Sequence, residues 1–142
     1  MNKITAGILS GLIATSVLSA LMVMKGMMGL MPDVDVINML AQRMGSGPAM
    51  GWIAHFMIGV VGYGIGYALI FSSLPLDGHS VRGMALGVAG WLVMMVVLMP
   101  MMGASLFGLQ MPGGMMAPIA TLMLHIIFGL VLGLAYAKLS SK

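Results

Sequence analysis

Apolar residues fill four long runs of the chain, and polar residues are largely confined to the segments between them. The runs cover residues 4–24, 49–71, 81–102 and 117–137. Each comes close to or exceeds the roughly 20 residues that a helix needs to cross the hydrocarbon core of a bilayer. The pattern predicts an all-α membrane protein, a four-transmembrane-helix bundle that forms a single membrane domain over residues 1–142.

The segment DVDVINMLAQRMGSGP, between the first two runs, has a different pattern. Its apolar residues recur at a spacing of i, i+3, i+4 and i+7, at Ile37, Leu40, Ala41 and Met44. That spacing places them on one side of a helix, and Asp33 or Asp35 can cap its start. We therefore expect a short interfacial helix after the first span.

Composition agrees with a protein that lies in lipid. The chain is 61% hydrophobic and 6% charged, whereas soluble domains contain about 25% charged residues. The net charge of +3 rests on few basic residues, so we expect the lipid bilayer and no nucleic acid among the partners. Without cysteine there are no disulfides or thiolate metal sites. The three carboxylates all lie outside the apolar runs. We expect no enzyme, because no nucleophile and base occur together.

One short sequence pattern occurs twice in the chain. A proline is followed after seven residues by a histidine and after four more by a glycine, in Pro48, His55, Gly59 and again in Pro118, His125, Gly129. Proline favours the first turn of a helix, so both histidines fall about 10 Å into a span.

Further matches suggest an internal duplication. Gly7 and Gly11 correspond to Gly83 and Gly87, and Met31-Pro32 corresponds to Met111-Pro112. The repeat predicts two similar hairpins, in about residues 1–73 and 79–142, related by an axis along the membrane normal.

Glycine and methionine gather at opposite ends of the predicted spans. Small residues let helices approach closely, and we expect helix packing at Gly7, Gly11, Gly62, Gly66, Gly83, Gly87, Gly129 and Gly133. Of the 20 methionines, only Met1 and Met84 belong to the same, cytoplasmic end. The bundle is therefore expected to be tight at that end and wider at the other.

The two histidines are the best candidates for a ligand site. Each shares a helix face with glycines and should point into the bundle, where ionisable groups often serve function. With Met57, Met94 and Met123 they offer imidazole and thioether ligands suited to copper, and the two rings could also hold haem b. The alternatives are that the histidines bond neighbouring helices and that the methionines fill gaps.

Basic residues in the short flanking segments set the expected orientation. One side carries Lys3, Arg82, Lys138 and Lys142, and the other carries Lys25 and Arg43. The excess places both termini in the cytoplasm.

Four stretches resemble small four-span inner-membrane proteins of uncharacterised bacterial families. They are MNKITAGILSGLIAT, MKGMMGLMPDVDVINMLA, HFMIG and HIIFG. The resemblance implies the architecture and a bacterial inner membrane, and no function. Two hypotheses follow: a non-enzymatic binding or accessory protein with a His/Met site in the periplasmic half, or a structural or assembly subunit without cofactor. In the second, glycine faces would dock another membrane protein or a second copy, and those faces should point outward.

Overall fold

The computed structural model describes residues 1–141 as helices joined by short connections. Four helical stretches are long and apolar enough to cross a membrane: Lys3–Met27, Pro48–Ser73, Gly78–Met101 and Met116–Ser140. No strand occurs within the described range. The prediction of an all-α membrane protein with four spans is confirmed. Lys142, one of the flanking cations, lies outside the described residues.

The spans differ in their regularity. The first is α1 (Lys3–Met27) and the fourth is α7 (Met116–Ser140). The second consists of α3 (Pro48–Phe56), the π-helix η1 (Met57–Tyr63), α4 (Gly64–Leu69) and the 3-10 turn η2 (Phe71–Ser73). The third consists of α5 (Gly78–Val93), the π-helix η3 (Met94–Leu98) and α6 (Met99–Met101). The connections contain α2 (Val36–Arg43) and the 3-10 turn η4 (Leu106–Gly108).

Polar side chains fix where the first two helices begin. The Asn2 side chain accepts the Thr5 N–H at 2.8 Å, and the Asp35 carboxylate accepts the Asn38 N–H at 3.0 Å. Such caps satisfy backbone donors that the first turn leaves without partners. The expected short amphipathic helix is thus α2, which buries Ile37 and Ala41.

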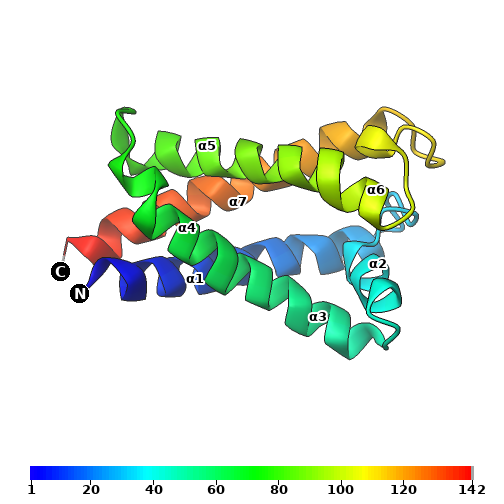
Figure 1. The fold of residues 1–142 in the computed structure, drawn as a ribbon, viewed down its shortest axis with the longest axis horizontal. Helices are drawn as coiled ribbons and strands as arrows, with labels where there is room; N and C mark the ends of the chain where they lie inside the picture. The colour runs from blue at the N-terminus through cyan, green and yellow to red at the C-terminus, as the bar shows by residue number, and fades with distance from the viewer. Residues whose placement is uncertain (142) are drawn as a thin grey trace.

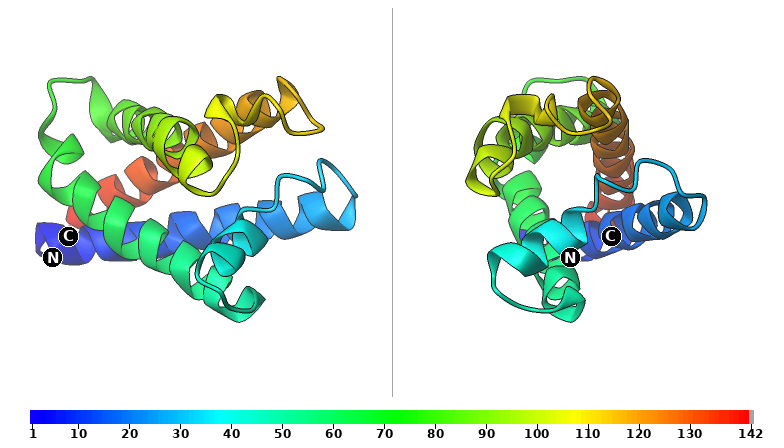
Figure 2. Two further views of the ribbon diagram at one scale, coloured as in Figure 1. Left: turned by 45° about the vertical axis from the view of Figure 1, so that its right-hand side comes forward. Right: turned by 90° about the vertical axis from the view of Figure 1, so that its right-hand side faces the viewer.

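The four spans surround a central axis. α1 packs against α4, η1 and α7, and α5 packs against α7. Viewed along the bundle, the spans stand at four corners, with the second diagonal to the fourth (Figure 2). Both termini lie at one end and α2 lies across the other (Figure 1). We call these the terminal half and the α2 half.

Backbone contact through glycine characterises the terminal half. A Cβ on Gly83 would collide with the Gly129 carbonyl oxygen, and one on Gly129 would collide with Gly83. Gly133 and Gly7 are equally close to backbone atoms of a neighbouring span. Gly87 and Gly11 continue these contacts to the middle of the bundle, beside the backbones of His125 and Gly59. At these positions the backbones of neighbouring helices are in direct contact, as is common where membrane helices carry small residues.

Two of the eight predicted packing glycines are not in such contacts. A Cβ on Gly62 or Gly66 would meet nothing within 4 Å, and the prediction is wrong for both. The physical reason is η1, where a π-turn adds one residue and moves the packing face onward. The contact positions after Gly59 therefore shift to Gly64, which lies against Gly7.

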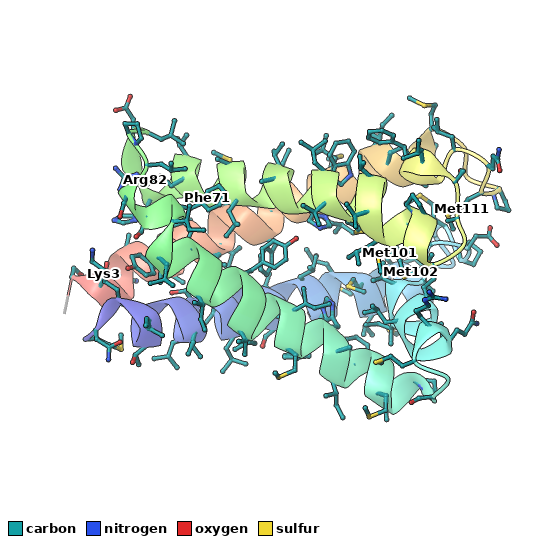
Figure 3. The ribbon with its side chains drawn as sticks, viewed as in Figure 1. Lys3, Phe71, Arg82, Met101, Met102 and Met111 are labelled. Carbon is teal, nitrogen blue, oxygen red and sulfur yellow. The ribbon has the colours of Figure 1, made fainter. Side chains whose placement is uncertain are left out.

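Aromatic side chains close the terminal half. Tyr67 is fully buried and its hydroxyl donates to the His79 carbonyl oxygen at 2.9 Å. The Tyr67 and Tyr136 rings meet edge to face with centroids 4.9 Å apart. Arg82, labelled at this end in Figure 3, donates to the Ser72 carbonyl oxygen at 2.7 Å. These contacts tie the second, third and fourth spans together.

Methionine dominates the other half. Met101, Met102 and Met111 lie at the opposite end of the molecule from Lys3 and Arg82 (Figure 3).

The connection after α6 folds back onto this end. Met95 and Met99 are buried beneath it, and the Phe107 ring lies 5.7 Å from the Trp91 ring.

Candidate functional site

The α2 half contains a partly open cavity of about 120 Å³ between the helices. All four spans and α2 contribute to its wall, and both His55 and His125 line it. They come from the second and fourth spans, which stand diagonally. The bundle therefore brings together two histidines that lie 70 residues apart in the chain.

A serine on the first span positions His55. The His55 Nε2 atom lies 3.3 Å from the Ser19 hydroxyl oxygen, and that hydroxyl donates to the Thr15 carbonyl oxygen at 2.7 Å. Because the hydroxyl hydrogen is engaged, the Ser19 oxygen is the acceptor for the His55 Nε2–H. The other ring nitrogen, Nδ1, then carries a lone pair that can bind a ligand.

A backbone carbonyl positions His125. Its Nδ1 atom lies 2.8 Å from the Thr121 carbonyl oxygen, one turn earlier in α7. A carbonyl only accepts, so Nδ1 carries the hydrogen and Nε2 has the lone pair. Trp91 secures this turn from the third span, donating its indole N–H to the Thr121 hydroxyl and to the Pro118 carbonyl oxygen, both at 3.1 Å.

Thr15 places an unsatisfied hydroxyl in the cavity wall. The residue is fully buried, and its Oγ1 atom has no hydrogen-bond partner within residues 1–141. An unpaired buried polar atom is costly and is rare in folded proteins. The hydroxyl packs against Gly59 of the second span, where a Cβ would collide with it.

The methionines divide between the cavity and the outer surface. Met94 is 7% exposed and lines the cavity. Met57 and Met123 are 56% and 61% exposed and do not line it, so their prediction as ligands is wrong. Each lies two residues from its histidine, about 200° around the helix, and therefore points outward. The other thioethers on the wall belong to Met22, Met31 and Met102.

Both π-helices contribute to the cavity. η1 begins two residues after His55 and supplies Gly59 and Tyr63, and η3 supplies Met94 and Leu98. π-turns are rare and occur frequently at functional sites. Their presence on two spans that face one cavity is a signal independent of the histidines.

Lys25 lies at the cavity wall, beside the connection to α2. Its ammonium group donates to the Met31 and Val34 carbonyl oxygens at 3.0 and 2.8 Å. Within residues 1–141 no three histidine, cysteine or acidic side chains are grouped to hold a metal ion. A metal in the cavity would therefore need sulfur ligands besides the two imidazoles.

The whole chain matches one family of proteins. Residues 1–142 match the family of unknown function DUF6789. The chain belongs to this family. No curated protein and no solved structure matches it.

Sequence reasoning missed the contribution of the first span. Thr15, Ser19 and Met22 all line or border the site. The spacing of these residues in the sequence could have indicated this. The two hydroxyl residues are four apart in an apolar span, so they share a face with Met22. Tyr63 also belongs to the site, because its ring lies 5.0 Å from that of Phe128 and both residues line the cavity.

Proposed function

We propose that this protein is a small, non-enzymatic membrane protein that binds Cu(I) between His55 and His125. One observation carries the proposal: two imidazoles from diagonal spans line the same cavity, together with buried methionine sulfur. In each ring the hydrogen-bonded nitrogen is occupied by a protein partner, which leaves the second nitrogen for a ligand. Such partners fix the tautomer and orientation of metal-binding histidines.

The ligand chemistry favours the monovalent copper ion. Thioether and imidazole groups suit Cu(I), and Met94 presents a thioether on the wall. Among the described residues, no carboxylate lines the cavity to offset a second positive charge. The Lys25 ammonium group on the wall repels a divalent ion more than a monovalent one, because Coulomb repulsion scales with charge.

The cavity is too small for haem b. Pockets for ligands of drug or cofactor size hold about 300–1,000 Å³, and this one holds about 120 Å³. A single ion with its ligands needs far less room than a porphyrin. Of the two cofactors expected from the sequence, we therefore retain copper.

Loss of each histidine tests the proposal. The full-length protein is purified under reducing conditions with Cu(I), and bound copper is measured by mass spectrometry. We expect His55→Ala and His125→Ala each to abolish binding, and the double variant to be no worse, because groups that act as a unit are not additive. His79→Ala is the matched control, since His79 lies in the terminal half and outside the cavity. Full copper content in the double variant would contradict the proposal.

We place both termini in the cytoplasm of a bacterium and the α2 half toward the periplasm. The basic flanks support this orientation, and the two termini lie at the same end (Figure 1). Reporter fusions after Ser141 and beside Arg43 should report opposite sides. A periplasmic signal from the C-terminal fusion would reverse the orientation.

A role as an assembly subunit is the second candidate. Gly62 and Gly66 face outward with open space beside them, so another membrane helix could approach there. Gly62→Leu should then leave the fold intact and remove crosslinks to a partner or to a second copy. Unchanged crosslinking would argue against this candidate. It would have no bearing on the copper proposal.

A further inference from the structure

A second hollow lies in the α2 half beside the first cavity, with which it shares Met22, Lys25 and Val34, and neither histidine lines it. It holds about 430 Å³ and is bounded by the end of α1, the connection to α2, and the starts of α2 and α3. This volume falls within the range of about 300–1,000 Å³ that small-molecule sites occupy. Among its lining residues are Lys25, Leu30, Asp35, Ile37, Asn38 and Trp52.

The hollow presents one positive and one negative group that do not pair with each other. Lys25 uses two of its three N–H groups on the Met31 and Val34 carbonyl oxygens. Within residues 1–141, the Asp35 carboxylate accepts only from the backbone N–H of Asn38 and from the side-chain amide of Asn38, the latter at 2.6 Å. An ionised carboxylate has about four acceptor positions, so both groups retain capacity for a ligand.

The remainder of the wall is apolar and lies at the end of two spans. Leu30 and Ile37 line it, and Trp52 adds an aromatic ring one turn into the second span. Tryptophan is enriched at this depth, where lipid headgroups meet acyl chains. Met27 and Leu30 continue the apolar surface outward, at 83% and 50% exposure.

We propose that this hollow binds the headgroup of a phospholipid that carries a phosphate and a primary amine. The phosphate lies at Lys25, which is suited to it as a positively charged donor. The amine lies at the Asp35 carboxylate, and the glycerol and acyl chains follow the apolar wall. A headgroup with only one of the two charges satisfies only one side of the site.

Lipid competition on the full-length protein in mild detergent tests this assignment. Native mass spectrometry measures retention of phosphatidylethanolamine against phosphatidylglycerol, which has no amine, and phosphatidylcholine, whose methylated amine cannot donate. We expect the primary-amine lipid to bind about tenfold more tightly, as a charged hydrogen bond implies. Equal retention of the three lipids would overturn the proposal.

Two variants separate the ends of the headgroup. Asp35→Asn removes the charge but keeps an N-cap residue for α2, and it should abolish the preference among the three lipids. Asp33→Asn is the matched control, because Asp33 is exposed and does not line the hollow. Lys25→Gln should weaken retention of all three lipids, and Lys25→Arg should restore it. An Asp35→Asn protein that keeps the wild-type preference would contradict the amine site.

A soluble competitor distinguishes lipid from free headgroup. Phosphoethanolamine carries both charges but has no acyl chains. We expect it not to displace the lipid, because the apolar wall holds the glycerol and chains. Displacement at concentrations comparable to those of the lipid would contradict a lipid site. Neither result depends on copper binding.

Discussion

The two halves of the bundle are built from different residues and pack differently. In the terminal half, Gly83 and Gly129 bring the backbones of α5 and α7 together. In the α2 half, the same four spans separate and enclose a cavity beside Met94 and the two histidines. The glycines hold the spans close at one end, and bulky side chains separate them at the other.

This difference explains where a ligand can be held. Close-packed backbones leave no space for a guest, whereas long flexible thioethers pack around irregular space. In the terminal half the buried Tyr67 hydroxyl is paired, since it donates to the His79 carbonyl oxygen. In the α2 half the Thr15 hydroxyl has no partner within the described residues. The close-packed terminal half thus stabilises the fold, and the α2 half has the space to bind a ligand.

The largest expected effect is a side chain inserted between the tight backbones. Gly83→Leu places atoms where the Gly129 carbonyl oxygen lies, and neither backbone can move without parting the helices. Overpacking costs about 1–3 kcal/mol even where side chains adjust, so we expect loss of folded, monodisperse protein in size-exclusion chromatography. Gly62→Leu is the matched control and should fold normally, because that position is open. Normal behaviour of both variants would remove the distinction between the halves.

The next effect concerns the thioether on the cavity wall. Met94→Leu keeps the volume and removes the sulfur, so we expect Cu(I) affinity to fall about tenfold, equivalent to about 1.4 kcal/mol. Met57→Leu should leave it unchanged, since Met57 is exposed and outside the cavity. Competition with a colorimetric Cu(I) chelator measures both. Equal affinities would exclude sulfur ligation by Met94.

Removal of one buried hydroxyl probes the terminal half. Tyr67→Phe removes the part-buried hydrogen bond from the Tyr67 hydroxyl to the His79 carbonyl oxygen, which should cost about 1 kcal/mol. Thermal unfolding in detergent should show a lower midpoint. Tyr63→Phe is the comparison, because within residues 1–141 the Tyr63 hydroxyl packs against Gly90 and forms no hydrogen bond. A larger loss for Tyr63→Phe would contradict this assignment.

The smallest effect is expected at Thr15. Thr15→Val exchanges a hydroxyl without a partner for a methyl of similar shape, so stability should change by less than about 0.5 kcal/mol or increase. Thr121→Val should cost about 1 kcal/mol, because that hydroxyl bonds Ala117 and Trp91. Chemical unfolding of the two variants side by side measures the contrast. A clear loss of stability for Thr15→Val would contradict the prediction, because it would mean that the Thr15 hydroxyl has a hydrogen-bond partner.

The sequence predicted more of the fold than of the site. The four spans follow from apolar runs of membrane length, and the α2 helix follows from one amphipathic stripe with Asp35 before it. Both are local patterns that need no knowledge of neighbours. Two of the predicted packing glycines, Gly62 and Gly66, were wrong, because regular helical spacing was assumed through η1. The internal duplication stays a prediction.

What the sequence alone determined is a membrane bundle of four spans, two of which carry a histidine seven residues after a proline. Only the tertiary structure decided which thioethers line the cavity with those histidines, Met94 and not Met57 or Met123. It also decided that Ser19 and Thr15 join the site from the first span. The physical reason is that the length and hydropathy of a segment can be read from the sequence. The direction in which a side chain points depends on the rotation of its helix relative to the neighbouring helices. One π-turn in η1 and another in η3 change that rotation without changing the apolar pattern.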